Sequence, residues 1–186
     1  MSLGGNNTFV ADDHAASNGG VLAYTGGSAD DSLTFEDNLA QDGGSATFDM
    51  SLGGNNILVA EDAAAESSGS LSYTGGSGDD SLTFNDDLAE EGGSATFDMS
   101  LGGNNTFEAD DYAAYSTGSI VYTGGAGDDS LTFDSDLAYY NGSATFNMSL
   151  GGDNTFVASG SSAAYSSGSI AYTGGAGNDS LTFGNH

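Results

Sequence analysis

The chain repeats itself every 49 residues. The string MSLGG begins each unit, at Met1, Met50, Met99 and Met148, and YTGG recurs at Tyr24, Tyr73, Tyr122 and Tyr172, with a one-residue insertion within residues 157–169. Each unit also has two similar halves, since residues 4–20 and 26–44 both run from Gly-Gly through a Thr-Phe segment to an acidic or alanine-containing loop. Such a period is typical of repeat architectures, in which neighbouring units bury one another. We treat residues 1–186 as one array of units 1–49, 50–98, 99–147 and an incomplete 148–186.

Alternating side chains predict β-strands in every half-repeat. From Ser45 to Leu52, the apolar residues Ala46, Phe48, Met50 and Leu52 fall on one face and polar residues on the other. The SLTF segments alternate in the same way, with Leu82 and Phe84 on one face. No stretch has an apolar stripe with the 3.6-residue period of a helix, so we expect an all-β chain with one buried face per strand.

Three all-β architectures fit this pattern. The half-repeats favour a parallel β-solenoid or β-roll of about eight coils, in which successive coils stack one strand spacing apart. A four-bladed β-propeller and an antiparallel meander are the alternatives. In a solenoid, like charges stacked at about 5 Å repel by roughly 1 kcal/mol or more per pair. Without a bound cation, we expect ladders of carboxylates to have raised pKa values or to loosen the stack.

The charge balance limits the partners. The chain has 27 Asp and Glu residues and no Lys or Arg, giving a formal net charge of −27. A polyanion of this kind does not attract phosphates, which excludes nucleic acid as a partner, and no run of 18 apolar residues is present for insertion into a membrane. Cys is absent, so disulfides and thiolate metal sites are excluded as well. The natural counter-charges are metal cations, protons or a basic partner.

A glycine-rich acidic segment follows each YTG. Residues 75–83 (GGSGDDSLT), 124–132 (GGAGDDSLT) and 174–182 (GGAGNDSLT) match the nonapeptide G-G-x-G-x-D-x-U-x in full, and residues 26–34 depart from it only at Ala29. These segments resemble the calcium-binding repeats of the RTX type. Glycines allow left-handed backbone and close carbonyl approach, and Asp supplies the hard oxygen that Ca²⁺ prefers.

The resemblance implies a set of calcium ligands and a fold. It makes Asp31, Asp80, Asp129 and Asp179 carboxylate ligands, with the neighbouring acidic and glycine positions completing the sites, and makes Leu33, Leu82, Leu131 and Leu181 inward-facing. The full candidate metal set is Asp30, Asp31, Gly75, Gly76, Gly78, Asp79, Asp80, Gly124, Gly125, Gly127, Asp128, Asp129, Gly174, Gly175, Gly177, Asn178 and Asp179. RTX repeats normally follow one another directly, whereas here a full motif comes once per 49 residues. Asn6, Asn55, Asn104 and Asp153 could complete mixed sites between unlike coils or could simply serve tight turns.

Two interpretations of the acidic residues stay open. They bind Ca²⁺, or they are solvated and keep a glycine-rich repeat protein soluble. The second interpretation carries more weight for the acids outside the motif, which include Asp12, Asp13, Glu61, Asp62, Asp110 and Asp111.

Catalysis has little support in the sequence. His14 and His186 are the only imidazoles, no nucleophile motif is present, and four near-equal copies favour structure over a single active site, so we expect no enzyme. We expect a calcium-stabilised, secreted structural protein: a self-assembling filament, biofilm-matrix or surface-layer subunit, or an adhesin stalk that associates head to tail. Millimolar Ca²⁺ outside the cell and the secretion of RTX-like proteins by Gram-negative bacteria imply an extracellular or cell-surface location. The alternative is a glycan- or ice-binding module that uses the Ser/Thr-rich strand faces, and loop tyrosines such as Tyr112, Tyr115, Tyr139 and Tyr140 would suit contacts with surface glycans or with a second copy.

Overall fold

The chain folds as a parallel β-solenoid. A computed structural model describes residues 4–184, and within them fifteen strands are formed and no helix. That range accordingly holds no helix with the length and apolar character that crossing a membrane requires. The strands make seven complete coils plus the first strand of an eighth, which confirms the predicted solenoid and shows that neither the propeller nor the meander is adopted.

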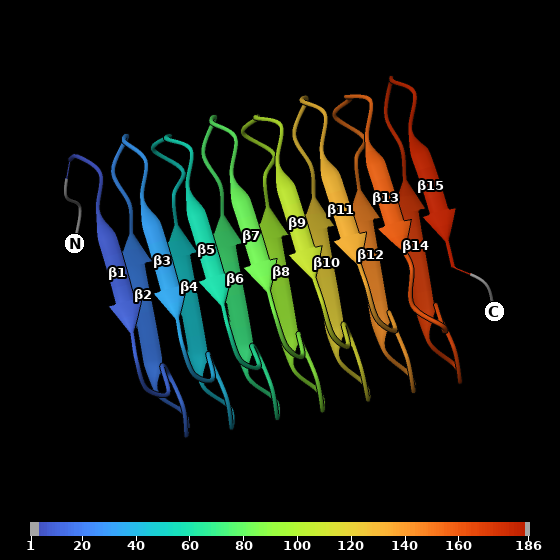
Figure 1. The fold of residues 1–186 in the computed structure, drawn as a ribbon, viewed down its shortest axis with the longest axis horizontal. Coiled ribbons are helices and arrows are strands. Elements are labelled where there is room, and N and C mark those ends of the chain that lie inside the picture. Colours follow the sequence, from blue (N-terminus) through green and yellow to red (C-terminus); the bar gives the residue numbers. More distant parts are fainter. Residues whose placement is uncertain (1–3, 185–186) are drawn as a thin grey trace.

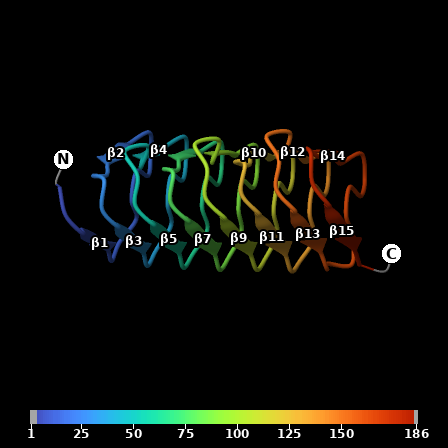
Figure 2. The ribbon, with the colours of Figure 1, turned by 90° about the horizontal axis from the view of Figure 1, so that it is seen from above.

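Two parallel sheets form the two sides of the solenoid (Figures 1 and 2). The odd sheet contains β1 (Thr8–Ala11), β3 (Ser32–Phe35), β5 (Ile57–Ala60), β7 (Ser81–Phe84), β9 (Thr106–Ala109), β11 (Ser130–Phe133), β13 (Thr155–Ala158) and β15 (Ser180–Phe183). The even sheet contains β2 (Val21–Thr25), β4 (Ser45–Asp49), β6 (Ser70–Thr74), β8 (Ser94–Asp98), β10 (Ser119–Thr123), β12 (Ser143–Asn147) and β14 (Ser169–Thr173). Glycine-rich turns join each even strand to the next odd strand along one edge, the turn edge, and acidic or alanine-containing loops join each odd strand to the next even strand along the other, the loop edge.

The core explains why the period is 49 residues rather than half of that. Large and small side chains alternate between successive coils: in the odd sheet Phe35 pairs with Ala60 and Ala60 with Phe84, and in the even sheet Ala46 pairs with Leu71. These side chains are at most 2% exposed. Because a large residue on one coil fills the space left by a small one on the next, two unlike coils interlock and together form the repeating unit.

The loop edge depends on left-handed backbone at residues other than glycine. An alanine with φ between 54 and 58° recurs once in every complete coil, at Ala16, Ala40, Ala65, Ala89, Ala114, Ala138 and Ala164. Ala40, Ala65, Ala89, Ala114 and Ala138 are fully buried. The sequence did not suggest this, because L-residues other than Gly, Asn and Asp rarely adopt this conformation.

Two details of the predicted strands are corrected or refined. Leu52 was expected to continue the buried face of its strand, but β4 ends at Asp49 and Leu52 is 59% exposed in the following turn. The inward-facing prediction holds for Leu33, Leu82 and Leu131, which are fully buried. Leu181 lies in the same register, paired with the buried Phe156, and is 42% exposed because β15 is an edge strand.

Candidate functional site

The acidic motif residues lie along the turn edge in two ladders that run from coil to coil. The inner ladder consists of Asn7, Asp31, Asn56, Asp80, Asn105, Asp129, Asn154 and Asp179, and the outer ladder consists of Asp30, Asn55, Asp79, Asn104, Asp128, Asp153 and Asn178. Each ladder therefore draws its members alternately from the GGxGDD turns and from the GGNN or GGDN turns. Of the four residues that could complete mixed sites or serve tight turns, Asn55, Asn104 and Asp153 lie in the outer ladder between residues of unlike coils.

The inner ladder is a buried hydrogen-bond chain. Oδ1 of Asp80 accepts hydrogen bonds from the backbone N–H and the Nδ2 of Asn56 at 2.8 and 2.9 Å, and its Oδ2 accepts one from the Gly76 N–H at 3.1 Å. The N–H of Asp80 donates in turn to Oδ1 of Asn105 at 3.0 Å. Asp129 repeats this arrangement with Asn105, Gly125 and Asn154.

Burial and hydrogen bonding oppose each other at these carboxyls. Asp31, Asp80 and Asp129 are at most 2% exposed. Burial raises the pKa of Asp80 and Asp129, and the hydrogen bonds from the preceding asparagine and from the turn glycine partly offset that rise. Both carboxylate oxygens of Asp80 and of Asp129 already accept hydrogen bonds from the protein. Coordination of calcium by Asp31, Asp80, Asp129 and Asp179 stays a prediction.

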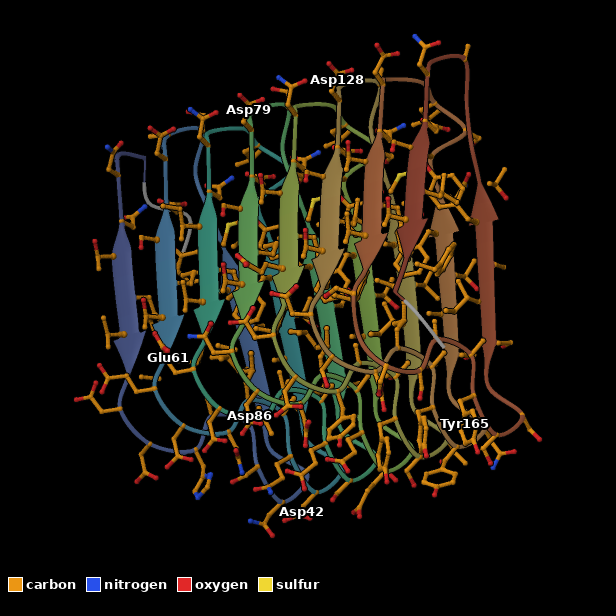
Figure 3. All side chains as sticks on the ribbon, turned by 45° about the vertical axis from the view of Figure 1, so that its right-hand side comes forward. Asp42, Glu61, Asp79, Asp86, Asp128 and Tyr165 are labelled. Atoms are coloured by element: carbon orange, nitrogen blue, oxygen red, sulfur yellow. The ribbon has the colours of Figure 1, made fainter. Side chains whose placement is uncertain are left out.

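The outer ladder is exposed to solvent. Oδ1 of Asp79 accepts the Asn104 N–H at 2.7 Å, and the N–H of Asp79 donates to Oδ1 of Asn55 at 2.8 Å. Asp79 and Asp128 point away from the solenoid into solvent (Figure 3). This ladder therefore also serves the turn backbone, while keeping its carboxylates accessible.

The expected repulsion between stacked like charges is largely avoided on the turn edge. In the inner ladder every Asp has an Asn on each neighbouring coil, and in the outer ladder only Asp128 and Asp153 are adjacent acids. The prediction of like charges at about 5 Å was wrong here because unlike half-repeats stack, which places an Asn between successive carboxylates. In the inner ladder the amide nitrogen of Asn56 donates to Asp80 and its amide oxygen accepts the backbone N–H of Asp31, and Asn105 does the same between Asp80 and Asp129.

The motif glycines permit close approach rather than left-handed backbone. Gly76 and Gly78 do not have a positive φ, but a Cβ would lie 2.6 Å from the Gly53 Cα in one case and 2.2 Å from the Gly54 carbonyl oxygen in the other. The positive φ angles fall instead on the glycines of the alternate turns, Gly53 and Gly54, at 117 and 88°. The same holds for Gly125, Gly127, Gly175 and Gly177 and their neighbours.

Carboxylates do stack from coil to coil on the loop edge. Five consecutive coils place an Asp two residues before the paired Ala or Leu of the loop, forming the acidic column of Asp13, Asp37, Asp62, Asp86 and Asp111. His14 caps the N-terminal end of the column, with its Nδ1 3.3 Å from Oδ1 of Asp37. The chain has no Lys or Arg that could neutralise the other members.

The C-terminal end of the acidic column contains a cluster of three acids. Asp86, Asp87 and Asp111 each place a carboxylate oxygen within 4.8 Å of the others, and all three are half-buried. Burial and a hydrogen bond with Asp62 raise the pKa of Asp86. Burial, followed by a hydrogen bond with Glu90 and the charges of Glu90 and Asp111, raises the pKa of Asp87 to about 7. Oδ1 of Asp87 is shielded from solvent and has no hydrogen-bond partner.

Sequence reasoning gave this edge too little weight. It included Asp111 among the weaker candidates and omitted Asp86 and Asp87, because their neighbours from adjacent coils lie about one half-repeat away in the sequence. Aligning the half-repeats on the Leu-Ala and Ala-Ala pairs would have shown the column of five acids. Two further groups gather at this edge, Asp13 with His14 and Asp37, and Glu108 with Asp110 and Asp134.

Comparisons with known proteins add no family. No protein-family model matches the chain. No curated protein and no solved structure matches it either.

Proposed function

We propose that the chain is a calcium-stabilised structural rod that acts outside the cell. The observation that carries the proposal is the acidic column, in which carboxylates from five successive coils stack without a Lys or Arg to offset them. A divalent cation relieves this repulsion and uses the hard oxygen ligands that Ca²⁺ prefers. The Ca²⁺ implied by the RTX-like turn motif supports the same proposal at the opposite edge.

The cluster of Asp86, Asp87 and Asp111 is the best-placed site on the loop edge. Asp86 and Asp87 belong to one coil and Asp111 to the next, so an ion that they share would link two coils. Oδ1 of Asp87 is buried without a hydrogen-bond partner, which is unfavourable for a carboxylate oxygen, and a bound cation would provide the missing partner. Because calcium would bind the folded coils and not the separated ligands of the unfolded chain, binding would stabilise the fold. The millimolar Ca²⁺ of extracellular fluids matches acidic sites of modest affinity.

A calcium titration with two matched variants tests the proposal and locates the ions. The urea midpoint of the wild-type chain, followed by circular dichroism, is expected to rise when Ca²⁺ replaces a chelator. The double variant Asp86→Asn/Asp111→Asn should lose most of that rise, whereas Asp79→Asn/Asp128→Asn, which changes the same number of charges on the turn edge, should keep it. The opposite pattern would assign the ions to the RTX-like turns, and a wild-type midpoint that does not respond to Ca²⁺ would exclude the calcium proposal.

The rod also offers edges for end-to-end association. β1 and β15 are the edge strands of the odd sheet, and Leu181 and Phe183 of β15 are 42% and 44% exposed. Phe183 corresponds to Phe35, which pairs with Ala60 on the next coil. At the other end of the sheet, Ala11 of β1 occupies the position that corresponds to Ala60. We propose that a second copy of the chain docks there, extending the rod into a filament or matrix. Sedimentation in Ca²⁺ should show assemblies that Phe183→Asp disrupts, and a wild-type chain that remains monomeric at high concentration would contradict this part of the proposal.

A second candidate function uses the outward face of the even sheet. Six successive coils place a serine at the first outward position, at Ser45, Ser70, Ser94, Ser119, Ser143 and Ser169, with Thr47, Thr96 and Thr145 beside them at alternate coils. A regular hydroxyl array is suited to a glycan or to the ordered water of ice. Screening against a glycan array and measuring ice recrystallisation test it: a positive result that Thr96→Glu removes supports this function, and negative results in both assays exclude it.

A further inference from the structure

Five of the nine tyrosines form an aromatic cluster on the loop edge of the C-terminal half. The tyrosine cluster consists of Tyr112, Tyr115, Tyr139, Tyr140 and Tyr165. Tyr115, Tyr139 and Tyr165 occupy one loop position in three successive coils, where earlier coils have Ser17, Gln41, Glu66 and Glu90. Their place at the outer end of the loops is seen at Tyr165 in Figure 3.

The rings of this ladder are stacked. The ring centroids of Tyr139 and Tyr165 are 5.0 Å apart with an interplanar angle of 16°, and those of Tyr115 and Tyr139 are 5.7 Å apart with an angle of 7°. Backbone hydrogen bonds hold the loops in register: the Ser116 N–H donates to the Tyr139 carbonyl at 3.1 Å, and the Asn141 N–H donates to the Ser166 carbonyl at 3.1 Å. The stacking therefore follows from the coil spacing.

The cluster has exposed members, whereas of the other four tyrosines Tyr73 and Tyr122 are buried and Tyr24 and Tyr172 are half-buried. Tyr140 and Tyr165 are 45% and 56% exposed, and Tyr139 between them is half-buried. The remaining tyrosines lie in the core column, where Phe separates them: Tyr73 pairs with Phe48 and Phe97, and Tyr122 pairs with Phe97 and Phe146. Within residues 4–184, tyrosine side chains from adjacent coils therefore contact each other only on the loop edge.

We propose that the tyrosine cluster is a site of oxidative coupling, in which Tyr139 and Tyr165 form a dityrosine bond between neighbouring coils. The oxidant is a peroxide, used by a peroxidase-type catalyst. Each phenol loses one electron and one proton, and one H₂O₂ takes up the two hydrogens to give two waters. The two phenoxyl radicals then join through the ring carbons ortho to their oxygens, and the ring hydrogens at those carbons move to the oxygens, which restores both phenols. The net change is the loss of two hydrogens and the gain of one C–C bond.

Such a bond would link neighbouring coils covalently in a chain that cannot form disulfides. The chain has no Cys for disulfides and no Lys for amine cross-links, whereas coupled phenols need neither residue. The bond closes a loop of the unfolded chain, as a disulfide does, and is therefore expected to raise the urea midpoint. This inference is independent of calcium binding.

Treatment with peroxidase and hydrogen peroxide at low protein concentration tests it. We expect dityrosine fluorescence in the monomer fraction, a mass lower by two hydrogens, and a cross-link between residues 139 and 165 after digestion with a protease that cuts at acidic residues. Tyr139→Phe and Tyr165→Phe, which keep a ring in the stack but remove the phenol, should each abolish that cross-linked peptide, and the control Tyr122→Phe should leave its yield unchanged. A monomer without the cross-link, coupling only between molecules, or a cross-link that persists in Tyr165→Phe at the same pair of peptides would overturn the assignment.

Discussion

The hydroxyl groups of Tyr73 and Tyr122 are shielded from solvent and have no hydrogen-bond partner. Both side chains are about 1% exposed in a column where phenylalanine occupies the intervening coils. A buried hydroxyl without a partner destabilises the folded state, since it hydrogen-bonds to water when the chain is unfolded. We therefore predict that Tyr122→Phe raises the free energy of unfolding by about 1 kcal/mol.

Urea denaturation of the purified variant measures this change. Tyr24→Phe is the matched control, because Tyr24 occupies the same column in the first coil but is only half-buried, and its hydroxyl is not among the buried atoms without a partner. The expected change for Tyr24→Phe is small. A lower stability for Tyr122→Phe would show that its hydroxyl has a partner in solution.

Thr117 has a left-handed backbone conformation that a β-branched residue rarely adopts. Its φ is +67°, and the equivalent residue on the preceding coil is Gly92, with φ +80°. Both positions are exposed, and a Cβ at Gly92 would meet only side-chain atoms, at 3.6 Å or more. We predict that Thr117→Gly stabilises the fold by about 1 kcal/mol and that Gly92→Thr destabilises it by a similar amount.

Thermal unfolding in chelator compares the two changes directly. The pair is reciprocal, so the double variant Thr117→Gly/Gly92→Thr should have a midpoint close to that of the wild type. A destabilising Thr117→Gly or a stabilising Gly92→Thr would contradict the prediction and would mean that the loops relax to other backbone conformations.

At the residue scale the sequence located the acidic turn but not the environment of its Asp. The GGxGDD spacing pointed to residues such as Asp80, yet its inward orientation depends on Asn56, which lies 24 residues away in the other half-repeat. A motif defined within nine residues does not contain that partner. The exposed Asp79 and the buried Asp80 are adjacent and chemically identical, and they hydrogen-bond to different asparagines of the neighbouring coils.

At the scale of strands and loops, the strands were predictable and the loops were not. Alternation within SATFD and SLTF fixes which residues face inward, and the structure confirms this for Phe48 and Phe84, both 1% exposed. Local conformational propensity does not predict the loop edge, because Ala65 and its equivalents adopt the left-handed backbone conformation there. The acidic column follows from that loop geometry and was therefore missed with it.

The loop edge makes the stability of the rod depend on pH. The pKa of Asp87 is raised from 3.8 to about 7, chiefly by burial and then by Glu90 and Asp111. A carboxyl with a higher pKa in the folded chain than in the unfolded chain holds its proton more tightly when folded. Its contribution to stability is therefore complete below pH 3.8 and is lost as the pH rises through about 7. We predict that, without Ca²⁺, the urea midpoint falls as the pH is raised from about 5 to about 8.

Asp87→Asn checks the origin of this dependence. The amide cannot ionise, so the variant should show a flatter profile over that range and a higher midpoint than the wild type at its alkaline end. Asp86, Asp111 and Glu90 face Asp87, and the raised pKa of Asp86 contributes in the same direction. A wild-type midpoint that rises with pH would contradict the sign of the effect.

On the scale of the whole molecule, stability depends on the order of unlike coils and not only on their number. Simple repeat proteins gain stability with each added unit, because each unit adds one interface with its neighbour. Here the interfaces require alternation: Asp80 lies between Asn56 and Asn105, and Ala46 lies against Leu71. Removal of one 49-residue repeat is therefore the smallest deletion after which every interface between coils is still of a kind found in the native chain.

Two deletions separate coil order from coil number. Removing residues 50–98 joins Asp49 to Met99, as Asp49 joins Met50 in the native chain, and leaves the alternation intact. Removing residues 50–74 takes out half as much but places Asp31 beside Asp80 and Ala46 beside Ala95 on neighbouring coils. In this shorter deletion, Asp31 and Asp80 become two buried carboxylates without an asparagine amide between them, and Ala46 beside Ala95 leaves a void in the core. We predict that the shorter deletion is the less stable by about 2 kcal/mol or more, measured by urea unfolding in chelator. If stability depended on coil number alone, the longer deletion would be the less stable, so the order of the two midpoints decides between the two explanations.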